Sequence, residues 1–141
     1  MAETGGPATP AAPAAPTPSV TVLVADDNEV AQRLCRRVLE KAGHKVLTAS
    51  DGIEAVALAL ANPLDMILMD VAMPGMDGLE AMRQIKVAKP GLAIVIASAH
   101  SMASDRERFL AAGADDVLSK PFRLTDLTAV VTRLTANRTA Q

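Results

Sequence analysis

The chain has 141 residues, of which 50% are hydrophobic and 21% are charged, so its size and composition suit one globular domain. Its formal net charge of -2 gives no electrostatic reason to expect nucleic acid or an anionic membrane as a main partner. No apolar run approaches the length of about 20 residues that spans a bilayer, and the first residues do not resemble a secretory signal. With a single cysteine, which excludes an internal disulfide, we expect one soluble, cytoplasmic domain.

Residues 1–18 differ in composition from everything that follows. Five prolines, Pro7, Pro10, Pro13, Pro16 and Pro18, are separated mostly by alanine and threonine, and Glu3 is the one charged residue. Such a segment neither forms a helix nor buries a core, so we predict a disordered arm with polyproline-II character. A passive tail is the favoured interpretation, and a docking peptide or the remnant of an interdomain linker are the alternatives.

From Ser19 onward, apolar runs alternate with segments of helical periodicity. We predict strands over 20–25, 45–49, 66–70, 92–97 and 115–119. Asn28 is a suitable cap for a first helix, whose apolar face includes Ala31, Leu34, Cys35, Val38 and Leu39. Further helices are predicted over 53–61, from Leu79 to a stop near Lys89, from Ser101 or Ala103 to Ala112, and from Leu124 onward. The folded domain is expected to span residues 19–136, followed by a polar tail over 137–141.

Five strands that alternate with helices through short loops indicate a parallel sheet covered on both faces. Among the few topologies that right-handed crossovers allow, the doubly wound flavodoxin-like order 2-1-3-4-5 is favoured. In this order the carboxyl ends of four strands converge on one edge of the sheet. The residues that come together there are Asp26 and Asp27, Asp70, Ser98 and Lys120.

Asp70 ends a wholly apolar run and is followed at once by a turn rich in Pro and Gly. Three carboxylates at one edge repel one another, and either Mg²⁺ or the Lys120 ammonium can relieve that repulsion. Such a site is suited to holding a phosphoryl group, with Asp70 as the nucleophile and the Ser98 hydroxyl as a later hydrogen-bond partner. Taken singly, each residue also has a plain structural interpretation as a helix cap or a loop residue, and Cys35 is expected to be buried packing.

These motifs resemble the receiver domain of bacterial two-component response regulators. The likeness rests on Asp26-Asp27, the block from Met69 to Gly78, Ser98-Ala99, and Gly113 to Asp116 leading to Lys120-Pro121-Phe122, and it covers about residues 20–135. It implies the following roles: Asp70 as phosphoacceptor; Asp26, Asp27, Asp70 and the Ala72 carbonyl as Mg²⁺ ligands; Lys120 as phosphoryl contact; Ser98 as switch; and a cis bond before Pro121.

The resemblance also implies partners. A histidine kinase or histidine phosphotransfer protein would supply the phosphoryl group, so the domain would catalyse only its own modification and its slow hydrolysis. Output would be a protein contact through the fourth helix, fifth strand and fifth helix, or transfer along a phosphorelay, by a monomer or weak homodimer. A fragment of a hybrid histidine kinase is an alternative.

One position departs from the family, a second argues against a related enzyme, and a third is a further candidate. Val117 stands where the family often carries the aromatic half of its switch, which favours a second alternative, a binding module that is not phosphorylated. Ala72 stands where an aspartate-nucleophile phosphatase needs a second acid, which argues against that enzyme. His100, two residues past Ser98, is a candidate modulator of dephosphorylation or partner choice, as is Ala72.

Overall fold

The computed structural model describes residues 20–99 and 102–139, with side chains through Thr135. The arm predicted over residues 1–18 and the candidate modulator His100 therefore lie outside the described residues. Within the part of the chain described, no helix is long and apolar enough to cross a membrane.

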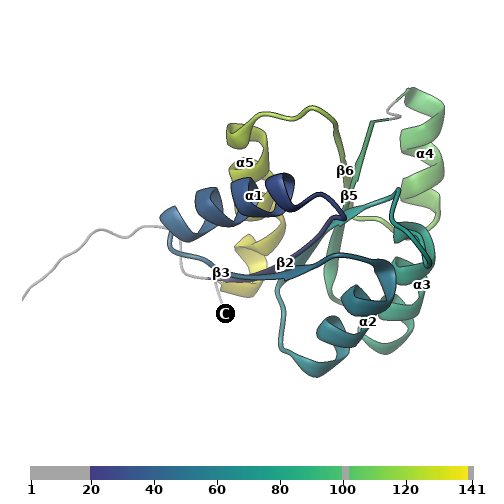
Figure 1. Ribbon diagram of the computed structural model, residues 1–141, viewed down its shortest axis with the longest axis horizontal. Coiled ribbons are helices and arrows are strands. Elements are labelled where there is room, and N and C mark those ends of the chain that lie inside the picture. Colours follow the sequence, from purple (N-terminus) through teal and green to yellow (C-terminus); the bar gives the residue numbers. More distant parts are fainter. Residues whose placement is uncertain (1–19, 100–101, 140–141) are drawn as a thin grey trace, which may run out of the picture.

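A five-stranded parallel sheet forms the centre of the domain (Figure 1). Its strands are β2 (Thr21–Ala25), β3 (Lys45–Ala49), β4 (Met66–Asp70), β5 (Ala93–Ser98) and β6 (Asp116–Ser119). Their spatial order is β3-β2-β4-β5-β6. This is the order 2-1-3-4-5 along the chain, so the predicted flavodoxin-like fold is confirmed, and each strand lies within one residue of its prediction.

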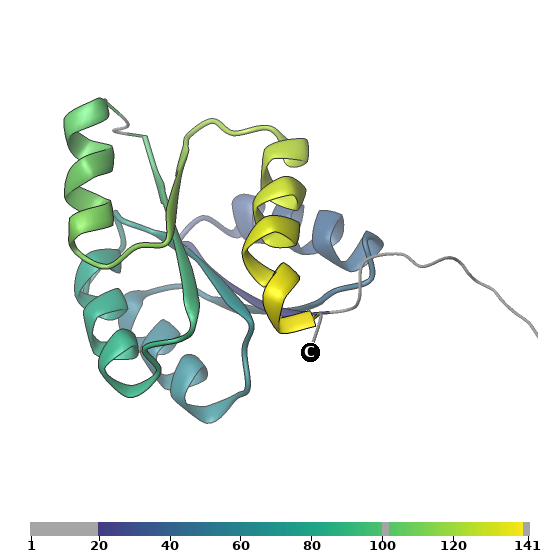
Figure 2. The ribbon, with the colours of Figure 1, turned by 180° about the vertical axis from the view of Figure 1, so that it is seen from behind.

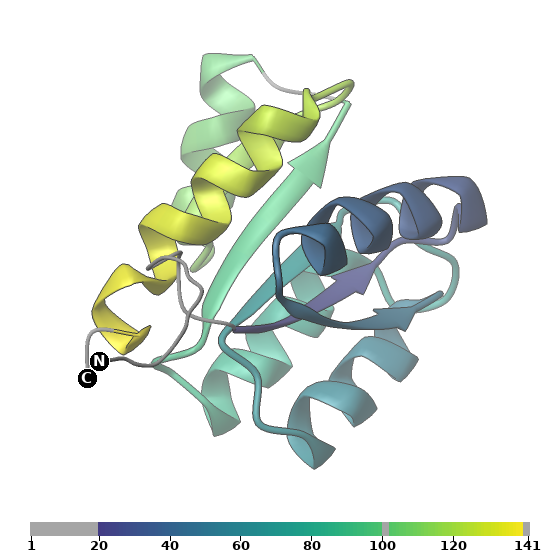
Figure 3. The ribbon, with the colours of Figure 1, turned by 90° about the vertical axis from the view of Figure 1, so that its left-hand side faces the viewer.

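Five helices cover the two faces of this sheet. They are α1 (Glu29–Lys41), α2 (Gly52–Ala61), α3 (Gly78–Ala88), α4 (Ala103–Ala111) and α5 (Leu124–Thr139). Helices α1 and α5 lie on one face, as the view from behind shows, and α2, α3 and α4 lie on the other (Figures 2 and 3).

The alternation of side chains along each strand explains why two apolar layers form. In β4, Met66 and Leu68 pack toward α1 and α5, whereas Ile67 and Met69 pack toward α2, α3 and α4. Every residue of β4 is buried, which is why this central strand reads as an unbroken apolar run rather than an alternating one. A carboxylate at its end therefore leaves the core only where the strand itself ends.

The first and last helices differ in how well the sequence predicted their ends. The Asn28 side chain accepts hydrogen bonds from the backbone N–H groups of Val30 and Ala31, as the predicted helix cap requires. At the other end of the domain, α5 continues to Thr139, so the helix includes the first residues of the polar tail predicted over 137–141. No Gly or Pro follows Leu134 to end the helix, so polar composition alone was a poor stop signal.

Candidate functional site

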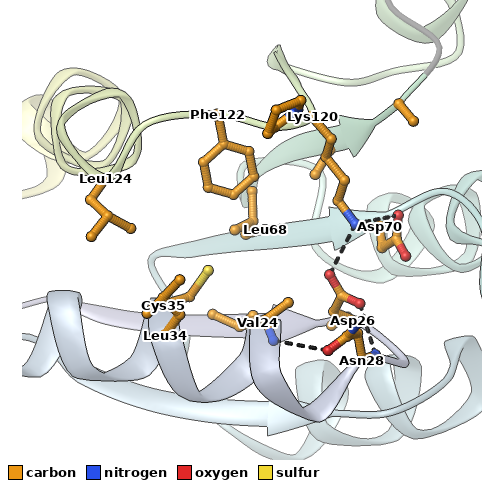
Figure 4. Close-up of a pocket in the computed structure, with 15 residues that line it drawn as sticks. Val24, Asp26, Asn28, Leu34, Cys35, Leu68, Asp70, Lys120, Phe122 and Leu124 are labelled. Atoms are coloured by element: carbon orange, nitrogen blue, oxygen red, sulfur yellow. Dashed lines mark hydrogen bonds and ion pairs between the residues drawn. The ribbon is translucent and has the colours of Figure 1, made fainter.

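The carboxyl ends of the strands bring the predicted residues together at one edge of the sheet (Figure 4). Asp26 directly follows β2, Asp70 is the last residue of β4, and Lys120 directly follows β6. Because β2 and β4 are hydrogen-bonded neighbours, their two carboxylates face each other across a short gap. Parallel strand ends thus bring these side chains to one place.

Three carboxylates form a compact acidic cluster. Asp26, Asp27 and Asp70 each offer an oxygen atom, and these atoms all lie within 4.8 Å of one another. Asp26 and Asp70 are only 6% and 7% exposed, whereas Asp27 is exposed. A set made only of carboxylate oxygens, with a net negative charge, fits a hard divalent cation such as Mg²⁺. Ala72 lies exposed in the loop after β4, and its carbonyl remains a predicted ligand.

Lys120 supplies the one cation that contacts this cluster among the described residues. Its Nζ lies 3.1 Å from Asp26 Oδ2 and 3.2 Å from Asp70 Oδ1, so it bridges two carboxylates from different strands. Burial lowers the pKa of Lys120, but the hydrogen bond and charge of Asp26, together with Asp70, outweigh burial and raise that pKa. The ammonium therefore stays charged at neutral pH.

At Asp70, by contrast, burial outweighs the favourable contact with Lys120. Burial raises the pKa of the Asp70 carboxyl, Lys120 opposes that rise, and the negative charges of Asp26 and Asp27 add to it. The ionised carboxylate is thus less favourable in the folded domain than in water. A bound cation, or a reaction that forms a bond to the carboxylate oxygen, reduces this unfavourable charge.

The loop after β4 holds the Asp70 backbone in place by close packing. The Gly78 N–H donates to the Val71 carbonyl at 3.0 Å, and Asp77 caps α3 by accepting from the Glu80 N–H at 2.9 Å. A Cβ atom at Gly78 would lie 2.1 Å from the Asp70 carbonyl oxygen, so only glycine allows this approach. Gly78, which ends the predicted block, therefore positions the backbone of Asp70.

A second set of contacts positions Asp26. Its Oδ1 accepts from the Asn28 N–H at 2.9 Å, which turns the carboxylate toward Lys120. The Gln32 amide of α1 donates to the carbonyl oxygens of Asp26 and Ala49, tying α1 to the ends of β2 and β3. Nothing in the sequence pattern pointed to Gln32, which has the character of an ordinary helix residue.

Ser98 and Lys120 are joined through the backbone. The Lys120 N–H donates to the Ser98 carbonyl at 2.8 Å, and Ser98 is buried. The peptide bond between Lys120 and Pro121 is cis. Val117 lies buried on the α2, α3 and α4 side of the sheet and does not join the site.

An apolar cavity of about 440 Å³ opens beside the acidic cluster (Figure 4). Its apolar wall includes Val24, Leu34, Cys35, Leu68, Phe122 and Leu124. Cys35 is buried, as predicted, and burial together with the charge of Asp26 raises the pKa of its thiol to about 11. Leu34, predicted on the buried face of α1, is instead 49% exposed at the cavity, because the space between α1 and the segment after β6 is not filled.

A family model described as the response regulator receiver domain matches residues 22–132. This chain belongs to the response regulator receiver domain family. Such domains are the receivers of two-component systems, so the family predicted from the sequence is confirmed.

Individual relatives agree with this assignment. Response regulator MprA of Mycobacterium sp. (strain KMS) is 42% identical over 110 residues, which cover 78% of this chain and 48% of that protein. The chain thus spans about half the length of the curated relatives it matches.

Solved structures give the same result. The receiver domain of a Francisella response regulator superposes with a TM-score of 0.81 at 30% identity, covering 84% of this chain and 98% of that one. The receiver domain of a Pseudomonas aeruginosa sensor histidine kinase superposes with a TM-score of 0.77 at 33% identity, covering 84% and 99%. That structure holds a magnesium ion coordinated in its active-site cleft.

Proposed function

We propose that this receiver domain accepts a phosphoryl group on Asp70 in a Mg²⁺-dependent reaction. The donor would be a phosphohistidine on a histidine kinase or a histidine phosphotransfer protein. The observation that carries the proposal is the placement of Lys120, which bridges Asp26 and Asp70 inside a cluster of three carboxylates. An acidic cluster alone would suit cation storage, but a fixed ammonium beside the acceptor suits charge neutralisation on a phosphoryl group.

The transfer would proceed by attack of an Asp70 carboxylate oxygen on phosphorus. An O–P bond forms, the N–P bond of the donor breaks, and the electron pair returns to the imidazole nitrogen, which takes up a proton. Lys120 lies close enough to the Asp70 carboxylate to donate to an oxygen of the incoming group. Asp26, Asp27, Asp70 and the Ala72 carbonyl would hold Mg²⁺, which supplies positive charge next to the phosphoryl oxygens when bound.

The domain would act on itself alone. Ser98 would hydrogen-bond a phosphoryl oxygen after transfer, and slow hydrolysis would return Asp70 to its free form. The output would be a phosphorylation-dependent protein contact through α4, β6 and α5, or transfer of the group along a relay.

The apolar cavity is suited to contact a helix of the phosphodonor protein. Leu34 and Leu124 are 49% and 40% exposed and lie on either side of the cavity, next to the acidic cluster. An apolar stripe on a donor helix could cover these side chains while its phosphohistidine reaches Asp70. We expect Leu34→Asp to slow transfer from a histidine phosphotransfer protein by about tenfold. Acetyl phosphate, which needs no such contact, should phosphorylate the variant at the wild-type rate, and equal slowing with both donors would contradict this contact.

The central test is the intact mass of the protein after incubation with acetyl phosphate. Wild type should gain one phosphoryl group with Mg²⁺ and none with a chelator, and Asp70→Asn should gain none in either condition. Lys120→Ala should still take up phosphate but signal poorly. Phosphate uptake by Asp70→Asn would contradict the acceptor assignment. A wild type that is not modified by acetyl phosphate or by a histidine phosphotransfer donor would favour a binding module instead.

A further inference from the structure

Two arginines from different helices meet one buried carboxylate at the start of β6. Asp116 is 7% exposed, and its Oδ1 accepts from Arg106 Nη2 of α4 at 2.9 Å. Its Oδ2 pairs with Arg133 of α5. Arg106 Nη1 also donates to the Val117 carbonyl at 3.1 Å, so one guanidinium contacts both a side chain and the backbone of β6. We call Arg106, Asp116 and Arg133 the Asp116 clamp.

Helix α4 has few other attachments to the domain. Phe109 is its only buried side chain among the residues that the structure describes. Met102 precedes the helix and gives its first turn no side-chain cap, whereas α1 is capped by Asn28 and buries two side chains. Figure 1 shows α4 at the outer margin of the molecule. Besides the buried Phe109, the half-exposed Arg106 adds two hydrogen bonds that join α4 to β6.

The same short strand connects the clamp to the acidic cluster. Among the strands that the structure describes, β6 lies at the edge of the sheet and pairs with β5 alone, and it ends directly before Lys120. Lys120 contacts Asp70 through its ammonium and Ser98 through its backbone. A shift of Lys120 therefore acts on a strand of four residues whose first residue is Asp116. None of the described strands lies on the outer side of β6, so a shift of Lys120 would disturb the ladder with β5 and the contacts of Asp116.

We propose that the Asp116 clamp holds α4 against β6 while Asp70 is unmodified and loosens when Asp70 carries a phosphoryl group. The new negative charge would draw Lys120 from Asp26 and displace β6, which carries both acceptors of Arg106. Val117 provides no aromatic ring to connect β6 with α4, and Arg106 makes that connection from the helix. This inference deepens the proposed function and rests on it for its link to Asp70.

The test is amide hydrogen exchange of α4 in the full chain with Mg²⁺, with and without beryllium fluoride as a phosphoryl mimic. Without the mimic, Arg106→Gln should speed exchange over residues 103–111 by about tenfold, because two hydrogen bonds are lost. The matched control is Glu107→Gln, which changes one charge on the next, exposed residue of α4 and should leave exchange unchanged. The mimic should speed α4 exchange in wild type but add little in Arg106→Gln.

A second variant and a second measurement distinguish the hold of the clamp on α4 from its coupling to Asp70. Asp116→Asn removes the shared charge with almost no change in size and should loosen α4 in the same direction. Because equilibrium coupling is reciprocal, both clamp variants should also bind beryllium fluoride about threefold more tightly than wild type in the presence of Mg²⁺. Circular dichroism establishes that each variant is folded.

Each contrary result has one meaning. Equal α4 exchange in wild type and both clamp variants without the mimic would show that the clamp does not hold the helix. If wild type is phosphorylated normally but the mimic leaves α4 unchanged, or speeds it equally in Arg106→Gln, then the clamp is not coupled to Asp70. A wild type that takes up no phosphoryl group contradicts the proposed function, and the comparison without mimic still decides whether the clamp holds α4.

Discussion

The two ends of the parallel sheet use charged residues in opposite ways. At the carboxyl end, three carboxylates lie within 4.8 Å of one another and share the ammonium of Lys120. At the amino end, three side chains that precede different strands each accept from a backbone N–H group at the start of a neighbouring strand. Asp65 accepts from the Thr21 N–H at 2.9 Å, His44 Nδ1 from the Val20 N–H at 3.2 Å, and Asp115 from the Ile94 N–H at 2.8 Å.

This difference separates residues that hold the fold from residues that are available for chemistry. A side chain that accepts from a backbone N–H at the start of a strand satisfies a donor and stabilises the domain. Carboxylates that face one another do the reverse, and functional sites commonly sacrifice stability in this way. Removing a carboxylate of the cluster and removing a side chain that accepts from a backbone N–H should therefore change the free energy of unfolding in opposite directions.

The largest effect should come from filling space beside Asp70. Gly78→Ala places a Cβ atom 2.1 Å from the Asp70 carbonyl oxygen, so the backbone must move. We expect a loss of about 2–3 kcal/mol in the free energy of unfolding, measured by urea titration, together with slower phosphorylation of Asp70. Gly91→Ala, at the amino end of β5, is the control, because nothing lies within 4 Å of its Cβ position. Equal stability of the two variants would contradict the close approach.

The next prediction compares the free energies of unfolding after removal of one aspartate from each end of the sheet. Asp115→Ala leaves the Ile94 N–H without its acceptor and Lys86 without its ion pair, so it should cost about 1–3 kcal/mol. Asp27→Ala, at the carboxyl end, should be as stable as wild type or more stable when no divalent cation is added, because repulsion within the cluster falls. Urea titrations in a chelating buffer measure both. A loss for Asp27→Ala as large as that for Asp115→Ala would remove the distinction between the two ends.

The sequence predicted the sheet and the cluster at its carboxyl end because both depend on local pattern and topology. Buried apolar runs located the strands, and the parallel order alone brings Asp26, Asp70 and Lys120 to the same edge. Gly78 was within the predicted block, but its role in packing against the Asp70 carbonyl depends on how the loop folds back. The spacing of residues along the chain does not indicate that Gly78 comes so close to the Asp70 carbonyl.

The features that were missed depend on contacts between distant side chains. Arg106 and Arg133 read as exposed residues on two separate helices, and only the packed structure brings both to Asp116. The cavity beside the site was equally unpredictable, because helical periodicity placed Leu34 on the buried face of α1. A gap between α1 and the segment after β6 leaves that side chain half-exposed. Periodicity indicates which face points inward, but it does not show whether the space there is filled.

Neutralising Asp70 should raise the free energy of unfolding, by less than the losses predicted above. Burial raises the pKa of this carboxyl above its ordinary value of 3.8, so its contribution to stability is present below pH 3.8 and is lost as the pH rises through the folded-state pKa. Asp70→Asn avoids that loss and should be about 1 kcal/mol more stable than wild type at pH 7 without Mg²⁺. The advantage should shrink toward pH 4 and on adding Mg²⁺, as thermal melts would show. A variant that is less stable than wild type at pH 7 would mean that the Lys120 contact outweighs the burial of the charge.

The smallest effect concerns pH at the amino end. Burial lowers the pKa of His44 below its ordinary value of 6.5, so the neutral ring that accepts from the Val20 N–H is favoured in the folded state. Its contribution to stability is present above pH 6.5 and is lost as the pH falls through the lower folded-state pKa, because the unfolded chain binds the proton first. His44→Asn keeps an acceptor without titrating, so between pH 7 and pH 5 it should lose less stability than wild type, by at most about 1.4 kcal/mol per pH unit. Parallel stability curves for wild type and His44→Asn would mean that this ring has no part in the acid sensitivity of the fold, and that the amino end of the sheet is insensitive to pH in this range.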